Sequence, residues 1–197
     1  ADGTALSKAD LELDKIIYKS LNKLDINIPI ISEERNVQKE AFMDKNYWLI
    51  DPIDGTSNYI NGGNEYTINI ALIQNGTPTI GVIVHPPSKK IWLALKKKVF
   101  IYDAFENLKT SIPESFINKK CPAIIISKER NKKIIEFINN IESKTIIHVS
   151  SSLKFCYLAS KKAVLYPRFS IIKKWDIAAG HAILKASGGD LINLNGK

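Results

Sequence analysis

The sequence predicts an α+β protein built in layers, and three features of its pattern lead to this class. An amphipathic helix opens the chain over residues 7–24, and several β-like runs follow between residues 47 and 95. Strand-like and helical segments then alternate through the rest of the chain. Each kind of segment buries an apolar face against a neighbour, which favours stacked sheets and helices. We expect two parts, residues 1–120 and residues 121–197.

The first part combines one helix with an antiparallel meander. In the helix of residues 7–24 the apolar side chains recur at helical spacing, and Ser7 followed by Asp10 is typical of a capping box. A short apolar piece at residues 28–31 and a strand over residues 47–50 follow. Three β-like runs then cover residues 66–73, 80–85 and 91–95, and the turns between them contain Gly or Pro, which predicts the meander.

The second part begins after a polar connection. Residues 96–120 have weak periodicity, so we place the boundary between the two parts there. Apolar residues at helical spacing predict helices over residues 132–141, 152–160 and 176–186. Short apolar runs predict strands over residues 123–127, 145–149, 163–166 and 190–194.

Composition excludes several classes of protein. Hydrophobic residues make up 45% of the chain, which is enough for a sizeable core and excludes wholesale disorder. No apolar run approaches the roughly 18 residues of a membrane span. The first residues, 1–4, carry neither a basic start nor an apolar stretch, so we expect a cytoplasmic protein and leave peripheral association with the inner face of the membrane open. Cys121 and Cys156 fit two thiols in a reducing compartment better than a bridge.

The net charge of +8 comes from 25 lysines and only three arginines against 20 acidic residues. The lysines are spread along the chain, whereas readers of nucleic acid cluster arginine or interleave aromatic residues with their basic ones. We therefore expect no nucleic-acid polymer as partner and interpret the lysines as solvated surface charge. The positive field that remains favours anionic substrates.

The densest chemistry lies in Asp51-Pro52-Ile53-Asp54-Gly55-Thr56, where an apolar strand ends in a turn. The turn lets both carboxylates and the carbonyl of Ile53 converge on one point. Carboxylates brought so close repel each other unless one is protonated or a cation lies between them, and oxygen ligands suit a hard cation such as Mg²⁺. Glu33, Glu34 and Asp176 could join this cluster from elsewhere. On this motif alone, a plain turn followed by a helix cap stays an alternative.

Several motifs in order resemble the inositol monophosphatase superfamily. The signature D-P-[IL]-D-G-T is matched by residues 51–56, and W-D-x-A-A-G is matched by Trp175-Asp176-Ile177-Ala178-Ala179-Gly180. Upstream, Ser32-Glu33-Glu34 is similar to a further block of the superfamily. The opening residues 2–10 are similar to its early block, with Ala5 and Leu6 in place of Pro-Val.

Within this superfamily the sequence is most similar to the CysQ-type 3′(2′),5′-bisphosphate nucleotidases. Residues 64–73, 151–156 and 165–169 carry this closer match, and the resemblance covers nearly the whole chain. It implies an α-β-α-β-α sandwich like that of inositol monophosphatase and fructose-1,6-bisphosphatase. It also implies a Mg²⁺-dependent phosphatase of sulfur metabolism that lithium inhibits.

The resemblance assigns roles residue by residue. It implies that two or three Mg²⁺ ions bind to Glu33, Asp51, the carbonyl of Ile53, Asp54 and Asp176. Thr56 and Asp10 would form the catalytic pair that orients the attacking water. The phosphate would lie on the backbone N–H groups of Gly55 and Thr56, where a helix start favours an anion. Glu34 would support the metal ligands rather than bind metal.

Ser151, Lys154 and Arg168 are the candidates for substrate discrimination. The spacing puts Ser151 and Lys154 one turn apart on one helical face, and Arg168 follows a predicted strand. The resemblance implies that these residues hold the phosphate that is not cleaved. The expected substrate is adenosine 3′,5′-bisphosphate (PAP), hydrolysed to AMP and phosphate by a monomer or homodimer. Hydrolysis of inositol monophosphate or fructose 1,6-bisphosphate, and an inactive homologue that binds nucleotides or partners, stay as alternatives.

Each of these residues also has a purely structural alternative. Asp10 and Asp176 could only cap helices, Glu33 and Glu34 could be solvated loop charges, and Lys154 and Arg168 could be surface charges. The histidines have no metal-ligand spacing, so we interpret them as structural. Cys156 is expected to pack in the core.

Overall fold

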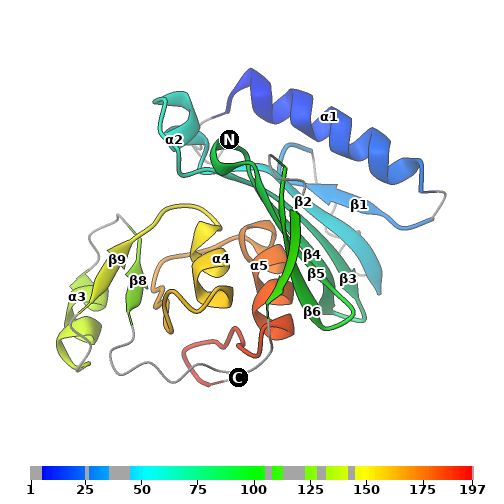
Figure 1. Cartoon of the computed structure of the whole chain (residues 1–197). Helices are drawn as coiled ribbons and strands as arrows, with labels where there is room; N and C mark the ends of the chain where they lie inside the picture. The colour runs from blue at the N-terminus through cyan, green and yellow to red at the C-terminus, as the bar shows by residue number, and fades with distance from the viewer. Residues whose placement is uncertain are drawn as a thin grey trace.

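Five layers follow one another across the molecule, as the computed structural model shows (Figure 1). The structure describes residues 6–24, 27–35, 45–104, 108–112, 123–127, 132–141 and 145–196. Within these ranges, helix α1 (Lys8–Asn22) covers one face of a seven-stranded sheet, and α4 (Leu153–Ala159) and α5 (Lys174–Ala186) cover the other. A two-stranded sheet and α3 (Lys132–Asn139) complete the stack. The expected α-β-α-β-α sandwich is confirmed.

The large sheet is a meander with one parallel strand at its edge. Strand β1 (Ile30–Ser32) runs parallel to β2 (Asn46–Asp54), and every later strand is antiparallel to the one before it. The later strands are β3 (Thr67–Gln74), β4 (Thr77–His85), β5 (Lys90–Leu95), β6 (Lys98–Asp103) and β7 (Leu108–Ile112). A single turn of 3₁₀ helix, η2 (Pro86–Ser88), joins β4 to β5.

The register of β2 against β3 shifts between Asp51 and Asp54. An irregularity of this kind bends a strand and re-aims its side chains, and it falls on the acidic motif. The short helix α2 (Thr56–Ile60) starts directly after it, with Gly55 as its N-cap at φ +93°. Only glycine adopts this left-handed conformation at little cost, so the turn depends on Gly55.

Three sequence predictions are wrong. Residues 98–103 and 108–112 of the presumed polar connection form β6 and β7, and the left-handed turn Lys96-Lys97 joins β5 to β6. Val99 of β6 is fully buried, so this segment is a strand of the core sheet. The lysine-rich turn before it gave the segment the composition of a polar linker. Residues 163–166 make only an isolated bridge, between Leu165 and Ile124, and residues 190–194 form no strand. The expected division of the chain at residue 120 stays a prediction.

The second sheet consists of β8 (Ile124–Ile126) and β9 (Ile146–His148), which pair in parallel. A small core of Ala123, Ile125, Val149, Leu153 and Ala163 joins it to α4. The larger core lies between the large sheet and α5. Fully buried Cys156 belongs to this larger core, as expected from the sequence, whereas Cys121 and the block at residues 2–5 lie outside the described residues.

Glycines let α5 lie against its neighbours at backbone distance. A Cβ on Gly81 of β4 would lie 2.4 Å from the carbonyl oxygen of Ala179, and a Cβ on Gly180 would lie 2.2 Å from the ring of Phe155. Larger residues at either position would push the helix away from the sheet or from α4. The close approach fixes α5, and with it the position of Asp176 in its first turn.

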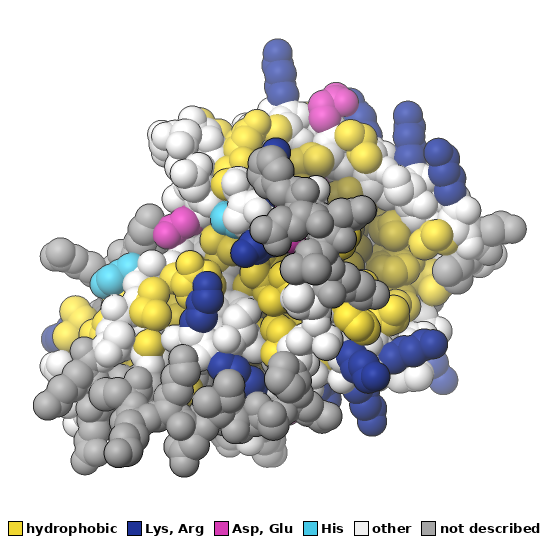
Figure 2. Space-filling view, viewed as in Figure 1, with side chains coloured by type: hydrophobic (Ala, Val, Ile, Leu, Met, Phe, Trp, Pro, Cys, Tyr) yellow, Lys and Arg dark blue, Asp and Glu magenta, His cyan; other side chains and the backbone are white. Residues whose placement is uncertain are grey.

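The surface carries its positive charge in a scattered way. Figure 2 shows lysine and arginine side chains distributed over the visible face rather than gathered in one patch, with few acidic side chains among them. In the described part of the chain, no helix is long and apolar enough to cross a membrane.

Candidate active site

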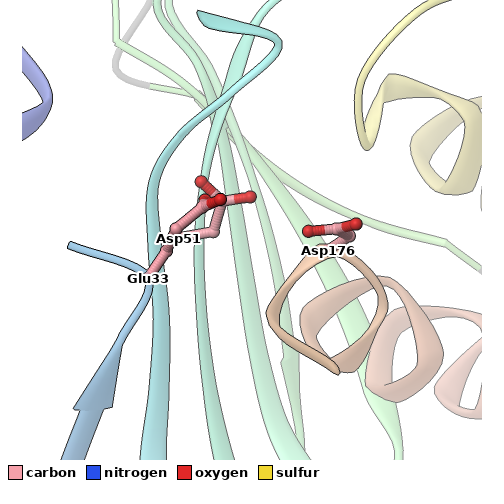
Figure 3. A group of neighbouring side chains, drawn as sticks. All are labelled: Glu33, Asp51 and Asp176. Atoms are coloured by element: carbon pink, nitrogen blue, oxygen red, sulfur yellow. The ribbon is translucent and has the colours of Figure 1, made fainter. Parts of the chain in front are cut away.

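Three carboxylates from distant parts of the sequence meet at one end of the large sheet. Glu33 follows β1, Asp51 lies in β2, and Asp176 lies in the first turn of α5. One oxygen from each lies within 4.8 Å of the others. Figure 3 shows Glu33, just past the end of β1, beside Asp51 on β2, with Asp176 facing them from α5. The fold thus brings together three of the carboxylates that the sequence analysis named as candidate ligands.

Burial makes this arrangement unfavourable without a cation. Asp51 is only 1% exposed, and its Oδ1 has no hydrogen-bond partner among the described residues. Burial raises the pKa of Asp51 well above its usual range, and the charges of Asp54, Glu33 and Asp176 raise it further. Burial, with Asp176 and Glu34 nearby, raises the pKa of Glu33 to about 7. A buried unpaired oxygen among oxygen ligands fits a hard divalent cation, which would supply the missing positive charge.

Asp176 combines two roles. Its Oδ2 accepts a hydrogen bond from the backbone N–H of Lys173 at 3.1 Å, so it caps α5. Burial is the main cause that raises its pKa, and the charge of Asp54 raises it further. The hydrogen bond from the Lys173 backbone and the charges of Arg168 and Lys173 lower it. The capping alternative and the ligand prediction are therefore compatible.

Asp54 lies beside the cluster but outside the group of three. Its charge raises the pKa of both Asp51 and Asp176, which places it close to each. Its Oδ2 accepts a hydrogen bond from Ser152 Oγ at 2.7 Å. Ile53 contributes its carbonyl oxygen to the same turn, where it accepts a hydrogen bond from Thr56 Oγ1 at 2.9 Å. The proposed metal roles of Asp54 and Ile53 stay predictions.

The predicted pair of Thr56 and Asp10 is in contact. Thr56 Oγ1 lies 3.2 Å from Asp10 Oδ1, across 46 positions of sequence. Asp10 is 1% exposed, and its Oδ2 accepts a hydrogen bond from the backbone N–H of Ser7 at 2.8 Å. The expected capping box is confirmed. Asp10 thus caps α1 with one oxygen and faces Thr56 with the other.

Glu34 lies within electrostatic reach of both α1 and the cluster of three, because its charge also raises the pKa of Glu33. Burial raises its pKa, and the nearby charges of Asp10 and Asp14 raise it further. Asp14 in turn pairs with Arg35 at 2.7 Å. The supporting role expected for Glu34 stays a prediction. Among the described residues, no histidine belongs to a group that could hold a metal.

Ser151, Lys154 and Arg168 line one cavity of about 80 Å³ together with Asp54 and Asp176. Lys154 is only 6% exposed and its Nζ lies 5.2 Å from the centre of the Tyr166 ring, so it is no surface charge. Arg168 donates from Nη1 to Tyr166 Oη and from Nη2 to the carbonyl of Ile171, each at 3.2 Å. The fold therefore brings two cations beside the acidic cluster.

One detail of that prediction is wrong. Ser151 does not share a helical face with Lys154, because α4 begins at Leu153 and Ser151 has a left-handed backbone at φ +52°. The strained turn still puts Ser151 on the cavity wall. The site also contains two residues that the sequence analysis missed, Asn69 and Ser152, which connect to Asp54 by hydrogen bonds. The only sequence signal for Asn69 is a polar residue within the apolar run Thr67–Gln74.

The raised carboxyl pKa predicts an unusual pH dependence for the metal-free protein. The folded state holds a proton on Glu33 up to about pH 7, against an ordinary value of 4.5, so it binds protons more tightly than the unfolded state. This contribution to stability is complete below pH 4.5 and is lost as the pH rises through about 7. We expect the melting temperature in EDTA to fall over that range. Glu33→Gln should flatten the slope, and an unchanged slope in this variant would contradict the assignment.

Comparison with known proteins agrees with this geometry. The sequence model of the inositol monophosphatase family matches residues 2–197. The 3′(2′),5′-bisphosphate nucleotidase CysQ of Salmonella typhimurium is 33% identical over 198 residues, which cover 100% of this chain and 79% of the relative. That of Buchnera aphidicola is 36% identical over 190 residues, covering 95% and 71%.

A solved structure extends the likeness to three dimensions. CysQ from Bacteroides thetaiotaomicron, described as a bacterial member of the inositol monophosphatase family, matches with a TM-score of 0.81 at 30% identity. The match covers 95% of this chain and 76% of that one. With its motifs in order, its acidic residues assembled and its layers superimposable, the chain belongs to the inositol monophosphatase family.

Proposed function

We propose that this chain is a Mg²⁺-dependent phosphatase that removes the 3′-phosphate of adenosine 3′,5′-bisphosphate, producing AMP and phosphate. The observation that carries the proposal is a pair of adjoining anion sites of different kinds. The acidic cluster takes a phosphate through a cation, and the cavity beside it offers Lys154 and Arg168 directly. A substrate with two phosphates uses both sites. The names of the relatives from Salmonella typhimurium and Buchnera aphidicola support this choice.

The metal site of this proposal consists of Glu33, Asp51 and Asp176, with Asp54 and the carbonyl of Ile53 at its edge. When bound, Mg²⁺ supplies the positive charge that phosphoryl transfer needs at the phosphate oxygens. The protein residues fix where that charge lies. Two or three ions are the number that the family resemblance implies.

Thr56 and Asp10 would activate the attacking water. A water that donates a proton to Thr56 Oγ1 can be deprotonated as Thr56 passes its own proton to Asp10 Oδ1, which lies 3.2 Å away. The second hydrogen bond of Asp10, from Ser7, holds the carboxylate in the orientation that this transfer requires. No side chain of the protein has to attack the phosphorus, so the phosphoryl group passes directly to water.

Lys154 and Arg168 would hold the phosphate that stays on the product. Arginine can bind phosphate oxygens with two parallel hydrogen bonds, and lysine adds a point charge. Ser151 contributes a neutral hydroxyl on the same wall, and the backbone N–H groups of Gly55 and Thr56 would face the phosphate to be cleaved. A single-phosphate substrate such as inositol monophosphate leaves the two cations without a ligand, which makes it the weaker candidate. An inactive homologue would have no need of an intact acidic cluster.

Arg168→Ala tests the choice of substrate. We expect the variant to lose about 2–4 kcal/mol of transition-state stabilisation, as for the loss of one charge pair. The loss is measured as a lower kcat/KM for adenosine 3′,5′-bisphosphate. Activity on a simple monophosphate should hardly change. Lys162→Ala is the control, because it removes a cation that contacts a tyrosine but lies outside the cavity. Equal losses of Arg168→Ala on both substrates would mean that Arg168 is structural and would remove the main support for the nucleotide.

The cytoplasmic location, any contact with a membrane surface and the choice between monomer and homodimer stay predictions from the sequence. The same holds for the absence of a nucleic-acid partner.

A further inference from the structure

A buried chain of hydrogen bonds runs from the centre of the large sheet to the acidic turn. Asn69 of β3 donates from Nδ2 to Ser152 Oγ at 2.8 Å. Ser152 Oγ then lies 2.7 Å from Asp54 Oδ2 and 3.0 Å from the carbonyl oxygen of Asp176. Asn69 and Ser152 are each 1% exposed. Ser152 therefore touches both the turn that carries Asp54 and the helix turn that carries Asp176.

The donors in this chain fix the direction of the Ser152 proton. The Asn69 amide donates to the serine oxygen, so the single hydroxyl proton has to go to Asp54 or to the Asp176 carbonyl. Of these two acceptors the carboxylate lies closer and forms the stronger, charge-assisted bond. Ser152 is the N-cap of α4, a position where serine usually bonds the helix backbone, yet here its side chain makes no such bond. The hydroxyl faces the acidic turn instead of its own helix.

Asn69 is an energetically unfavourable residue at its position in the sheet. It lies in the sheet interior, opposite Asp51 in the register of β2 and β3. Its Oδ1 is buried and has no hydrogen-bond partner among the described residues, which costs stability compared with an apolar side chain. Fold stability alone therefore does not explain why this position holds an asparagine. The hydrogen bond that orients Ser152 explains it.

We propose that Ser152, oriented by Asn69, is a positioning residue that holds the carboxylate of Asp54 in a fixed orientation beside the first turn of α5. This pre-shapes the acidic site before its cation binds. The inference rests on the proposed function only for the reaction that the site serves. Groups that hydrogen-bond metal ligands typically change metal affinity by about 10- to 100-fold when they are removed. The hydroxyl of Ser152 has this relation to Asp54.

Ser152→Ala tests the proposal by Mg²⁺ binding to the substrate-free protein, measured by titration calorimetry. We expect the Kd for Mg²⁺ to rise about 10-fold or more, and the Mg²⁺ concentration for half-maximal activity to rise in parallel. Ser152→Thr keeps the hydroxyl and should restore most of the Mg²⁺ affinity. Ser187→Ala is the matched control, because it removes another serine hydroxyl that is 1% exposed, bonded to the Leu184 carbonyl.

Asn69→Leu provides a second, independent route to the same result. It keeps the branching of the side chain but removes both polar atoms, so Ser152 loses the donor that orients it and the Mg²⁺ Kd should rise. Both residues act through the hydroxyl proton of Ser152. The effects of Asn69→Leu and Ser152→Ala on the Mg²⁺ Kd should therefore not add in the double variant. A Mg²⁺ Kd within twofold of wild type in Asn69→Leu, or in a folded Ser152→Ala, would overturn the proposal. Calorimetry measures Mg²⁺ binding without turnover. A lack of hydrolysis of the nucleotide would therefore count against the proposed function alone.

Discussion

Asp51→Asn is expected to lower kcat/KM by about 10³-fold or more while raising the melting temperature of the metal-free protein. A metal ion contributes several kcal/mol of charge stabilisation to phosphoryl transfer, and each 1.4 kcal/mol is about tenfold in rate. Asp51 is the most deeply buried member of the cluster, with one oxygen lacking a partner among the described residues. Removing its charge weakens cation binding and also relieves repulsion from Asp54, Glu33 and Asp176.

The two opposite effects make this result specific. Activity is measured with and without EDTA and with Mg²⁺ added back, and stability by thermal melting in EDTA. Asp14→Asn is the matched control, since Asp14 is 5% exposed but pairs with Arg35 away from the cluster. It should lower stability and leave turnover unchanged. Full wild-type activity in EDTA, or a metal-free Asp51→Asn protein that melts lower than wild type, would contradict the metal site.

Thr56→Ala has the second largest expected effect, a loss of about 10²- to 10⁴-fold in kcat, the usual contribution of general acid–base groups. The three clustered carboxylates should stay in place, because the Thr56 hydroxyl lies against Asp10 and the Ile53 carbonyl and not against those carboxylates. Asp10→Asn should fall in the same range, and the double variant should lose little more than either single one.

Ser7→Ala separates the relay from the helix cap. It removes the side chain that caps α1 with Asp10 but leaves the Asp10 carboxylate facing Thr56. We expect a loss of about 1 kcal/mol in stability, typical of a cap, with turnover nearly intact. If Asp10→Asn behaves in the same way, losing stability but not turnover, then Asp10 is only a cap and the proton relay is wrong.

The acidic turn at Asp51 and the contact of Thr56 with Asp10 could be predicted from the sequence because each depends on a short motif with a fixed local conformation. The turn after β2 sets Asp51 relative to Thr56 whatever the rest of the chain does. The capping box fixes Asp10 at the start of α1 in the same local way. Family motifs then joined these pieces across the chain.

What could not be predicted depends on packing between distant elements. A lysine such as Lys154 gives no local sign of burial, which here results from α4 packing between the two sheets. The left-handed backbone conformation of Ser151 could not be predicted, because the residue is neither glycine nor asparagine. Asn69 and Ser152 meet across 83 positions of sequence, so neither signals the other. Strand β6 was hidden because its lysine-rich turn has the composition of a linker.

The origin of the cluster in distant segments has a consequence for how the chain folds. The β2–β7 meander pairs neighbouring strands and closes short loops, so it can form early, whereas Asp176 joins Glu33 and Asp51 only after α5 has docked on β3 and β4. During synthesis, Glu33 and Asp51 leave the ribosome long before Asp176 exists. A cation therefore finds no complete site on the nascent chain. It acts on the finished protein, where ligand binding to the native state alone opposes unfolding.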